Sequence, residues 1–378
     1  MEAIYTCAAT FAGAGIGYTA YQRVRNIHKA GCLKEVITGY TQRQPHVPSS
    51  KILTFPWMRI VAWLTRDANV IRDLIFDRAA SWFVQPCDVF HGWSDQCLFS
   101  LRRARALGAV TFVERPNSHP RSQQQLLEEE FSRWGYGAHN PVDSVGMRRA
   151  LVEFEEAGFI TVPSKFAYDS MIAEGVPKEK LFLIPYGVDT QRFRPGSPPV
   201  GTFRLLFVGQ VSLRKGVPYL LEAWQRLHLP HAELWLVGRV MPNIRHAISS
   251  FLTDQTIRFL GHRKDPSPLY QAASAFVLPS IEEGSALVTY EAMASGLPLI
   301  FTPNCGAVSR DGIEGIQVPI RDVDALAAAI ERLYEDPGLA REMGQAGRRR
   351  AEDFTWEAVG PLLLSAYRKA LRTRGKPT

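Results

Sequence analysis

The chain has 378 residues, long enough for two domains of the usual ~100–200 residues each. Hydrophobic residues make up 46% of it and charged residues 21%, which excludes a disordered chain, a collagen and a coiled coil. The net charge of +7 is spread over both halves, so no basic tail or domain indicates a nucleic-acid partner. This mild positive balance suits anionic ligands or an anionic membrane surface.

The five cysteines are too few for a disulfide scaffold, form no C-x-x-C pair and have no histidine at zinc-finger spacing. No run of about 18 uncharged apolar residues predicts a membrane-spanning helix. The first residues lack the basic segment that opens a signal peptide. We therefore expect a reduced, cytoplasmic protein.

The chain opens with a pattern typical of a strand, a glycine loop and a helix. Residues 3–10 are apolar and rich in β-formers, and Gly13, Gly15 and Gly17 follow. Residues 18–30 have helical character. Further strands are expected at 33–38, 89–91, 109–114, 158–163 and 182–185, and a charged helix at 122–134. Such alternation predicts a parallel sheet with right-handed crossovers.

Residues 51–84 predict one or two amphipathic helices. The segment has an apolar and aromatic side with two arginines, which are Trp57, Met58, Ile60, Trp63 and Leu64 with Arg59 and Arg66. Core packing is the favoured interpretation. The alternative is a lipid-facing surface, which would give a peripheral contact with the inner face of the membrane.

A proline-rich stretch at 192–203 is the best linker candidate, and the alternation restarts after it. Strands are expected at 203–208, 233–237, 256–260, 275–278 and 299–301, and helices at 217–227, 269–273, 287–294, 323–334, 338–350 and 355–372. The sequence thus predicts two doubly wound α/β halves. Ligands of such sheets bind at the carboxyl ends of the strands, and two facing sheets make a cleft.

The most informative motif has two carboxylates with seven residues between them, Glu283 in a glycine-containing loop and Glu291 in the helix that follows. The backbone amides from Ser285 to Val288 would be the unpaired N–H groups at that helix start, and they suit a phosphate. Glu291 could accept from a ribose diol and Glu283 from sugar hydroxyls. The alternative is two solvated acids.

A second motif delivers two cations at the end of another strand. Gly209 ends the strand, and Arg214 and Lys215 precede the next helix. Cations at this edge suit a diphosphate, while the alternative is a basic surface loop.

In this order the motifs resemble the family-4 retaining glycosyltransferases of GT-B fold. The resemblance is good over residues 155–365 and weak before them. It rests on Pro185-Tyr186-Gly187-Val188-Asp189, Gly209 with Arg214-Lys215-Gly216, Leu236-Val237-Gly238, Phe259-Leu260-Gly261, Pro279-Ser280, Glu283-x7-Glu291-Ala292-Met293-Ala294, Gly296-x-Pro298 and Phe354-Thr355-Trp356-Glu357. It implies an acceptor-binding domain at 1–195 that includes a returning helix at 355–378, and a nucleotide-sugar domain at 196–354.

The resemblance also implies roles for single residues. Lys215 would pair with the donor diphosphate, Glu291 would bind the ribose, and Glu283 would bind the donor sugar. The remaining donor contacts would come from Gly209, Arg214, Gly261, His262, Gly284, Ser285, Leu287 and Val288. Two departures stand out: Gln210 occupies the usual place of an arginine, for which Arg214 is the candidate substitute, and Ser285 occupies that of an aromatic residue.

In the first half, the resemblance implies that the loop with Gly15 and Gly17 approaches the donor phosphates and the acceptor. A G-x-G-x-x-G fingerprint fails because Tyr18 stands at its last glycine, which argues against a nicotinamide enzyme. His119 resembles the family's histidine beside the reacting sugar, with local helix capping as the alternative. His91 is left open between a structural and an acceptor-lining role. Residues 128–130, all glutamate, predict a solvated helix face.

Together these features predict a retaining, metal-independent hexosyltransferase without a cofactor, acting in polysaccharide or glycoconjugate biosynthesis. Its partners would be a UDP- or GDP-sugar and a glycan or lipid-linked acceptor. The alternatives are an inert nucleotide-sugar-binding protein and another nucleotide-sugar enzyme such as an epimerase.

Overall fold

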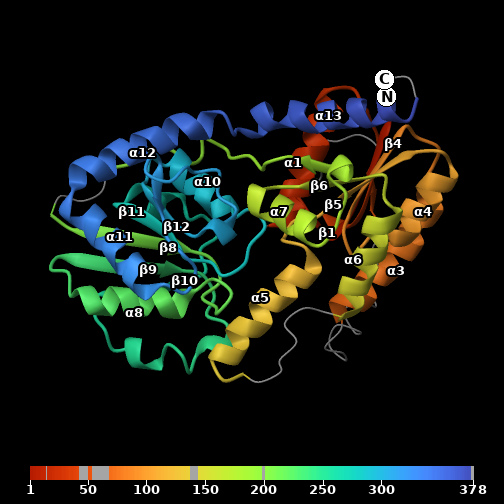
Figure 1. Ribbon diagram of the computed structural model, residues 1–378. Coiled ribbons are helices and arrows are strands. Elements are labelled where there is room, and N and C mark those ends of the chain that lie inside the picture. Colours follow the sequence, from red (N-terminus) through yellow and green to blue (C-terminus); the bar gives the residue numbers. More distant parts are fainter. Residues whose placement is uncertain (14, 42–49, 53–67, 137–143, 198–200, 376–378) are drawn as a thin grey trace.

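A computed structural model describes residues 1–13, 15–41, 50–52, 68–136, 144–197 and 201–375 (Figure 1). Within these residues, two parallel sheets form two lobes. The first sheet has the strand order β3-β2-β1-β4-β5-β6-β7, and the second has the order β10-β9-β8-β11-β12-β13. In each sheet the order reverses beside the first strand of the lobe, and this leaves a crevice at the carboxyl ends of the strands.

The first lobe alternates strands and helices. Its elements are β1 (Ala3–Phe11), α1 (Ile16–Lys29), β2 (Leu33–Thr41), β3 (Ser50–Ile52), α3 (Ala68–Phe83), β4 (Val89–Trp93), α4 (Leu98–Ala106), β5 (Val110–Glu114), α5 (Pro120–Arg133), α6 (Ser144–Glu156), β6 (Phe159–Val162), α7 (Lys165–Ala173) and β7 (Leu181–Leu183). The strands β1, β4 and β5 are buried almost throughout, as expected for a sheet covered on both faces.

The second lobe repeats the pattern and ends in three helices. Its elements are β8 (Phe203–Val208), α8 (Val217–Leu227), β9 (Ala232–Val237), β10 (Ile257–Gly261), α9 (Ser267–Gln271), β11 (Ala275–Leu278), α10 (Leu287–Ala294), β12 (Leu299–Phe301), β13 (Gly315–Gln317), α11 (Val323–Glu335), α12 (Pro337–Glu352) and α13 (Trp356–Thr373). The helices α11 and α12 begin at the side-chain caps of Asp322 and Asp336.

Most of the expected elements are confirmed, including the strand at 203–208 and the helix at 287–294. The helices α4, α6 and α7 and the strand β13 were not predicted. The helical prediction for 51–84 is wrong at its start, because residues 50–52 form the edge strand β3, paired with β2. The helix α3 confirms its end, and the proposed lipid-facing residues 57–66 lie outside the described residues.

The last helix returns to the first lobe. Figure 1 shows α13 leaving the second lobe and running over α1. The Val188 N–H donates to the Phe354 carbonyl at 2.9 Å, and the Asn26 amide donates to the Trp356 carbonyl at 2.7 Å. The strands before and after residue 195 belong to different sheets, although the exact domain boundary stays a prediction.

A buried polar network holds α13 in place. The Tyr367 hydroxyl lies 2.6 Å from Nδ1 of His91, which is fully buried. Nε2 of His91 and Nε of Arg23 each lie 3.5 Å from the Glu114 carboxylate, to which Tyr5 donates at 3.1 Å. Burial, with a smaller contribution from the charge of Arg23, lowers the pKa of His91 to about 3. His91 is therefore a neutral structural residue here, and the acceptor-lining alternative has no support.

This network predicts a pH-dependent stability. Between pH 6.5 and about 3, the unfolded chain protonates His91 while the folded chain does not, so the free energy of unfolding falls as the pH falls. The variant His91→Gln has no imidazole at this position, so its stability lacks this contribution to the pH dependence. We expect the stability advantage of the wild type over the variant to shrink by about 2 kcal/mol between pH 7 and pH 5 in urea titrations. A constant difference would contradict the buried neutral imidazole, and the exposed His246→Gln serves as the control.

Candidate functional site

Two cations and a carboxylate meet at the carboxyl edge of the second sheet. Arg214 and Lys215 lie in the turn between β8 and α8, and Glu283 lies in the loop after β11. Nζ of Lys215 is ion-paired with Oε1 of Glu283, and Nη2 of Arg214 lies 2.9 Å from the same oxygen. Burial acts to raise the pKa of Glu283, but Arg214 and Lys215 outweigh it and lower that pKa. The structure thus brings these three predicted residues together as a charged cluster.

Glu282, which sequence reasoning missed, joins this cluster to the first lobe. Its carboxylate is buried and accepts from the Ser118 hydroxyl at 2.7 Å and from the Gln123 amide at 3.1 Å. Nη1 of Arg214 lies 3.3 Å from Oε2 of Glu282, the oxygen that also accepts from Gln123. Two adjacent glutamates in a loop carry no periodicity, so the sequence held no signal for which of them faces which lobe.

The lobes also touch through backbone at Gly284. A Cβ at this position would overlap the Pro116 carbonyl oxygen, and the Ser164 hydroxyl donates to the Gly284 carbonyl. Only glycine therefore permits this approach. The predicted donor residue Gly284 is the point at which the first lobe meets the loop that carries Glu283.

Glu291 lies on α10 beside the ring of Tyr270. The Tyr270 hydroxyl donates to the Glu291 carboxylate at 2.9 Å. Burial raises the pKa of Glu291 to about 7, against the opposing effects of Tyr270 and Arg192. Arg192 also forms an ion pair with Asp265 at 2.9 Å, so its positive charge acts on two carboxylates, Asp265 and Glu291.

The helix start that the sequence proposed as a phosphate site is present, and Leu287 and Val288 form its first turn. Ser285, just before it, is turned inward, because its hydroxyl lies 2.9 Å from the Tyr290 hydroxyl and donates to the Gly306 carbonyl at 3.1 Å. The departure from the usual aromatic residue therefore places a small buried side chain here.

Glycines at the ends of the strands form the rest of the carboxyl edge of the second sheet. A Cβ at Gly238 would overlap the carbonyl oxygen of Gly209, and the Gly238 N–H donates to the Gly261 carbonyl at 3.0 Å. His262, which directly follows Gly261, is exposed. Gln210 is also exposed, whereas Arg214 is held by Glu282 and Glu283.

In the first lobe, the glycine loop leads into α1. Gly15 precedes the helix with φ +59°, and a Cβ at Gly17 would overlap the Thr10 carbonyl oxygen. This loop thus lies close against the end of β1, at the carboxyl edge of the first sheet, while residue 14, directly before Gly15, is not described.

His119 caps the start of α5, and its side chain has contacts within the first lobe. Its Nδ1 accepts from the Arg121 N–H at 3.3 Å and lies 3.9 Å from the Glu174 carboxylate, and its backbone N–H donates to Ser170. Burial lowers the pKa of the ring to about 4. These contacts favour the capping alternative, and the catalytic role stays a prediction.

The prediction of a solvated face at residues 128–130 is wrong for Glu130, which is fully buried. Its carboxylate accepts from Trp134 at 2.9 Å, from Tyr219 at 3.2 Å and from Arg321 at 2.8 Å. Tyr219 and Arg321 belong to the second lobe, so α5 is a second bridge between the lobes. Figure 1 shows α5 reaching toward α8.

Other features of the described residues assign no further site. None of their helices is long and apolar enough to cross a membrane, and they contain no group of three or more potential metal-ligating side chains. A cavity of about 890 Å³ lies at the opposite edge of the second sheet, near the starts of β8 and β11. Its wall includes Gly196 and Gly201, on either side of undescribed residues, and we assign it no ligand.

Comparison with known proteins identifies a matching family for the second lobe and relatives that align with more of the chain. Residues 202–336 match the family Glycosyl transferases group 1. An MMP alpha-(1->4)-mannosyltransferase of Mycolicibacterium hassiacum is 33% identical over 225 residues, which are 56% of this chain and 54% of that protein. A D-inositol 3-phosphate glycosyltransferase of Pseudarthrobacter chlorophenolicus is 30% identical over 292 residues, which are 70% of this chain and 66% of that protein. The chain spans about half the length of the first of these relatives.

Solved structures share the whole fold. The sucrose-phosphate synthase of Thermosynechococcus elongatus matches with a TM-score of 0.74 at 21% identity, covering 99% of this chain and 100% of its own. Anabaena HepE in complex with UDP-glucose matches with a TM-score of 0.71 at 16% identity, covering 98% of this chain and 100% of its own. The predicted fold class, GT-B with two doubly wound domains, is confirmed.

The contact at Gly284 predicts the effect of a single methyl group. The variant Gly284→Ala must push the Pro116 backbone away, so we expect the lobes to separate and the radius of gyration in X-ray scattering to rise. We also expect the melting temperature to fall by several degrees, because the bonds of Glu282 and Ser164 weaken. The control is Gly347→Ala in α12, where a Cβ has ordinary contacts of 3.6 Å and longer. An unchanged radius with an unchanged melting temperature would contradict the close contact.

Proposed function

Because residues 202–336 belong to the family Glycosyl transferases group 1, we propose that this protein is a glycosyltransferase. It would move a hexose from a nucleotide-diphospho-sugar to a hydroxyl of a glycan or lipid-linked acceptor. The donor is a UDP- or GDP-sugar, and HepE, which shares the fold, is found with UDP-glucose. The cytoplasmic location and the membrane contact stay predictions from the sequence.

The observation that carries the proposal is the charged cluster beside the start of α10. Arg214 and Lys215 lie at a strand end with Glu283 between them, next to helix amides. The net charge of the cluster is zero when all four of its side chains are ionised, which are Arg214, Lys215, Glu282 and Glu283. A bound diphosphate would therefore add negative charge beside cations that already have carboxylate partners in the protein. Lys215, Arg214 and the amides would stabilise the leaving diphosphate as its charge develops.

We propose that the reaction retains the anomeric configuration. The acceptor hydroxyl oxygen would bond to the anomeric carbon on the face from which the diphosphate oxygen leaves. The hydroxyl proton would pass to that departing oxygen. Glu283 would hold the donor sugar through its hydroxyls, and no cofactor or metal takes part in the proposed reaction.

The other donor contacts follow from position in the fold. Glu291 would accept from the ribose hydroxyls, and Gly261 with His262 would lie near the base. Gly15 and Gly17 would border the phosphates from the first lobe once the lobes close. We assign His119 no catalytic step, since its bonds are to α5 and to the Ser170 hydroxyl of α7.

One observation favours a second function, an inert nucleotide-sugar-binding protein. Gln210 is exposed where the related enzymes usually carry an arginine, and Arg214 is held by two carboxylates. The two functions share the donor site and differ in turnover.

Donor turnover separates them. We expect UDP or GDP release from one member of a panel of UDP- and GDP-sugars incubated with the protein and a mixed glycan acceptor. The variant Lys215→Ala removes a buried cation, so we expect at least tenfold weaker UDP binding in calorimetry. Glu283→Gln frees both cations, so we expect it to bind UDP at least as tightly as the wild type and to lose transfer.

The control is Lys165→Ala, an exposed lysine paired with Asp169 in the first lobe. Nucleotide binding without release from any sugar would leave the inert protein as the answer. Loss of UDP binding in Glu283→Gln would contradict the proposed division of roles.

The ribose role of Glu291 predicts a pH dependence. With a pKa of about 7, the carboxyl must ionise before it can accept from both hydroxyls. The affinity for the productive UDP- or GDP-sugar should therefore fall about tenfold from pH 8 to pH 6, as the ionised fraction falls. In Glu291→Gln we expect weaker binding with no such slope. Calorimetry at pH 6, 7 and 8 checks this, and a flat wild-type profile would refute it.

A further inference from the structure

The end of α5 is packed into the second lobe, although the helix starts in the first. Phe131 is buried within the hydrophobic cluster that forms the core of the second lobe. Trp134 packs against that cluster, and its ring and that of Tyr219 meet edge-on with 6.0 Å between their centroids. At the other end of the helix, the backbone N–H of His119 donates to Ser170 of α7 at 2.8 Å. The helix therefore spans the two lobes, with one end held in each (Figure 1).

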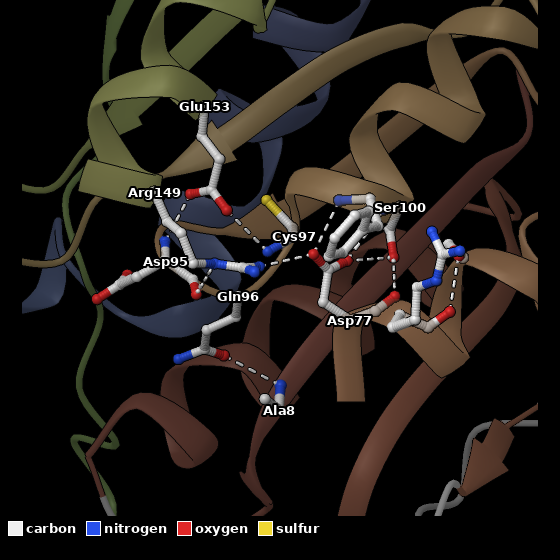
Figure 2. A network of polar contacts seen from close by, with 11 residues as sticks. Ala8, Asp77, Asp95, Gln96, Cys97, Ser100, Arg149 and Glu153 are labelled. Atoms are coloured by element: carbon white, nitrogen blue, oxygen red, sulfur yellow. Dashed lines mark hydrogen bonds and ion pairs between the residues drawn. The ribbon is translucent and has the colours of Figure 1, made fainter. Parts of the chain in front are cut away.

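The first-lobe end of α5 lies against a fixed base. The ring of His119 contacts that of Phe154 on α6, with 5.9 Å between the centroids. Figure 2 shows how α6 is tied to its neighbours: Arg149 pairs with the buried Asp77 of α3 at 2.7 Å, and Glu153 accepts from a backbone N–H at the start of α4 at 3.0 Å. Because α6 is held in this way, the base of α5 is fixed relative to the first lobe.

Glu130 makes the polar contact at the far end of α5, and it is fully buried. Its Oε2 accepts from the Tyr219 hydroxyl at 3.2 Å and from Nε of Arg321 at 2.8 Å, while its Oε1 accepts from Trp134 at 2.9 Å. A buried carboxylate needs such partners, because leaving it unpaired costs much free energy. The carboxylate therefore holds α5 against α8 and against the start of α11.

Arg321 supports this contact from an unusual backbone conformation. Its φ is +64°, a left-handed value that residues other than glycine seldom adopt. Its guanidinium also lies 3.2 Å from the Glu129 carboxylate and donates to the Leu126 carbonyl at 3.2 Å. Strained residues persist where their surroundings hold them in place, and this side chain is held by three groups of α5.

The same face of α5 reaches the donor cations from two directions. Gln123 and Glu130 are seven residues apart, about two helical turns, and so lie on one face of the helix. Gln123 donates to Glu282 at 3.1 Å, and Glu282 in turn pairs with Arg214. Tyr219, which Glu130 holds, lies in the first turn of α8, directly after the turn that carries both cations.

The link between the cations and α8 is tightly packed. Gly216, which follows Lys215 and precedes α8, has φ +65°. A Cβ at this position would overlap the Pro279 carbonyl oxygen. The turn has little room to deform, so a displacement of α8 also moves Lys215.

We propose that Glu130 is a positioning residue for the donor diphosphate: through Tyr219 it fixes α8, and through α8 it fixes the turn with Arg214 and Lys215. It acts through these residues and not by contact with the donor. The inference rests on the proposed donor site and adds to it a contact made by the first lobe. Because coupling is reciprocal, a bound diphosphate stabilises the contact between α5 and α8 as much as that contact strengthens binding.

Calorimetry with UDP and GDP tests this positioning role. Tyr219→Phe keeps the ring against Trp134 and removes the hydroxyl that bonds Glu130, while Glu130→Gln removes the charge. We expect the affinity for the nucleoside diphosphate to fall about fivefold in Tyr219→Phe and about tenfold in Glu130→Gln, because both cations lose their fixed position. With a productive donor sugar, KM should rise by the same factors while kcat stays within about twofold.

The matching nucleoside, uridine or guanosine, separates positioning from a general loss of structure. It lacks the diphosphate, so we expect its affinity in NMR titrations to stay within about twofold of the wild type in both variants. The control is Glu129→Gln, which removes a charge from the same helix and from the same arginine partner. Its side chain is 45% exposed, and an exposed ion pair contributes little, so we expect wild-type affinity for the nucleoside diphosphate.

Three outcomes would overturn the inference. They are unchanged diphosphate affinity in both Tyr219→Phe and Glu130→Gln, equal losses for the nucleoside and its diphosphate, and an equal loss in Glu129→Gln. Tyr219→Phe decides the matter if Glu130→Gln melts early, because it removes one hydroxyl and adds no group.

The same titrations separate this inference from the proposed function. Diphosphate binding that depends on Glu130, without transfer from any sugar, would reject the enzyme and keep the positioning role. Transfer by the wild type, with unchanged diphosphate affinity in both variants, would keep the enzyme and reject the positioning role.

Discussion

The carboxylate of Glu282 is the interaction on which the arrangement of the site depends. A buried charge is costly unless hydrogen bonds or opposite charges surround it, and its partners come from both lobes. Ser118 and Gln123 bond it from the first lobe, and Arg214 from the second. Because these partners surround the carboxylate only when the lobes are together, Glu282 ties the position of Arg214 to the contact between the lobes. The backbone contact at Gly284 lies two residues away and acts in the same direction.

Buried carboxylates occupy hydrogen-bond donors at the carboxyl edges of both sheets. In the second lobe, Glu282 and Glu283 partner the cations Arg214 and Lys215. In the first lobe, Asp77 and Glu153 accept from the amides at the start of α4. A ligand that uses any of these donors must therefore compete with a carboxylate that the protein already holds in place.

The errors of prediction share one physical origin. Glu130 was predicted on a solvated face, but its burial depends on Arg321, a partner far along the chain. The open role of His91 was likewise decided by a distant partner, Tyr367. The strand β3 is three residues long and exists because β2 offers a free edge, a pairing that no local pattern encodes. Glu282 could not be separated from Glu283, since the choice between them is made by the first lobe. His119 matched the position expected of it, and its side chain still bonds locally.

The sequence by itself determined the alternation of strands and helices, the strand-end glycines and the spacing of Glu283 and Glu291, because these depend on neighbours within a few residues. It also placed Arg214 and Lys215 at the right edge, since parallel strands bring their carboxyl ends to one side. Only the tertiary structure decided how the lobes meet, which glutamates become buried and that α13 packs on α1. In each of these cases a buried charge or a buried surface needs partner groups from distant segments of the chain. Those partners come together only in the folded protein.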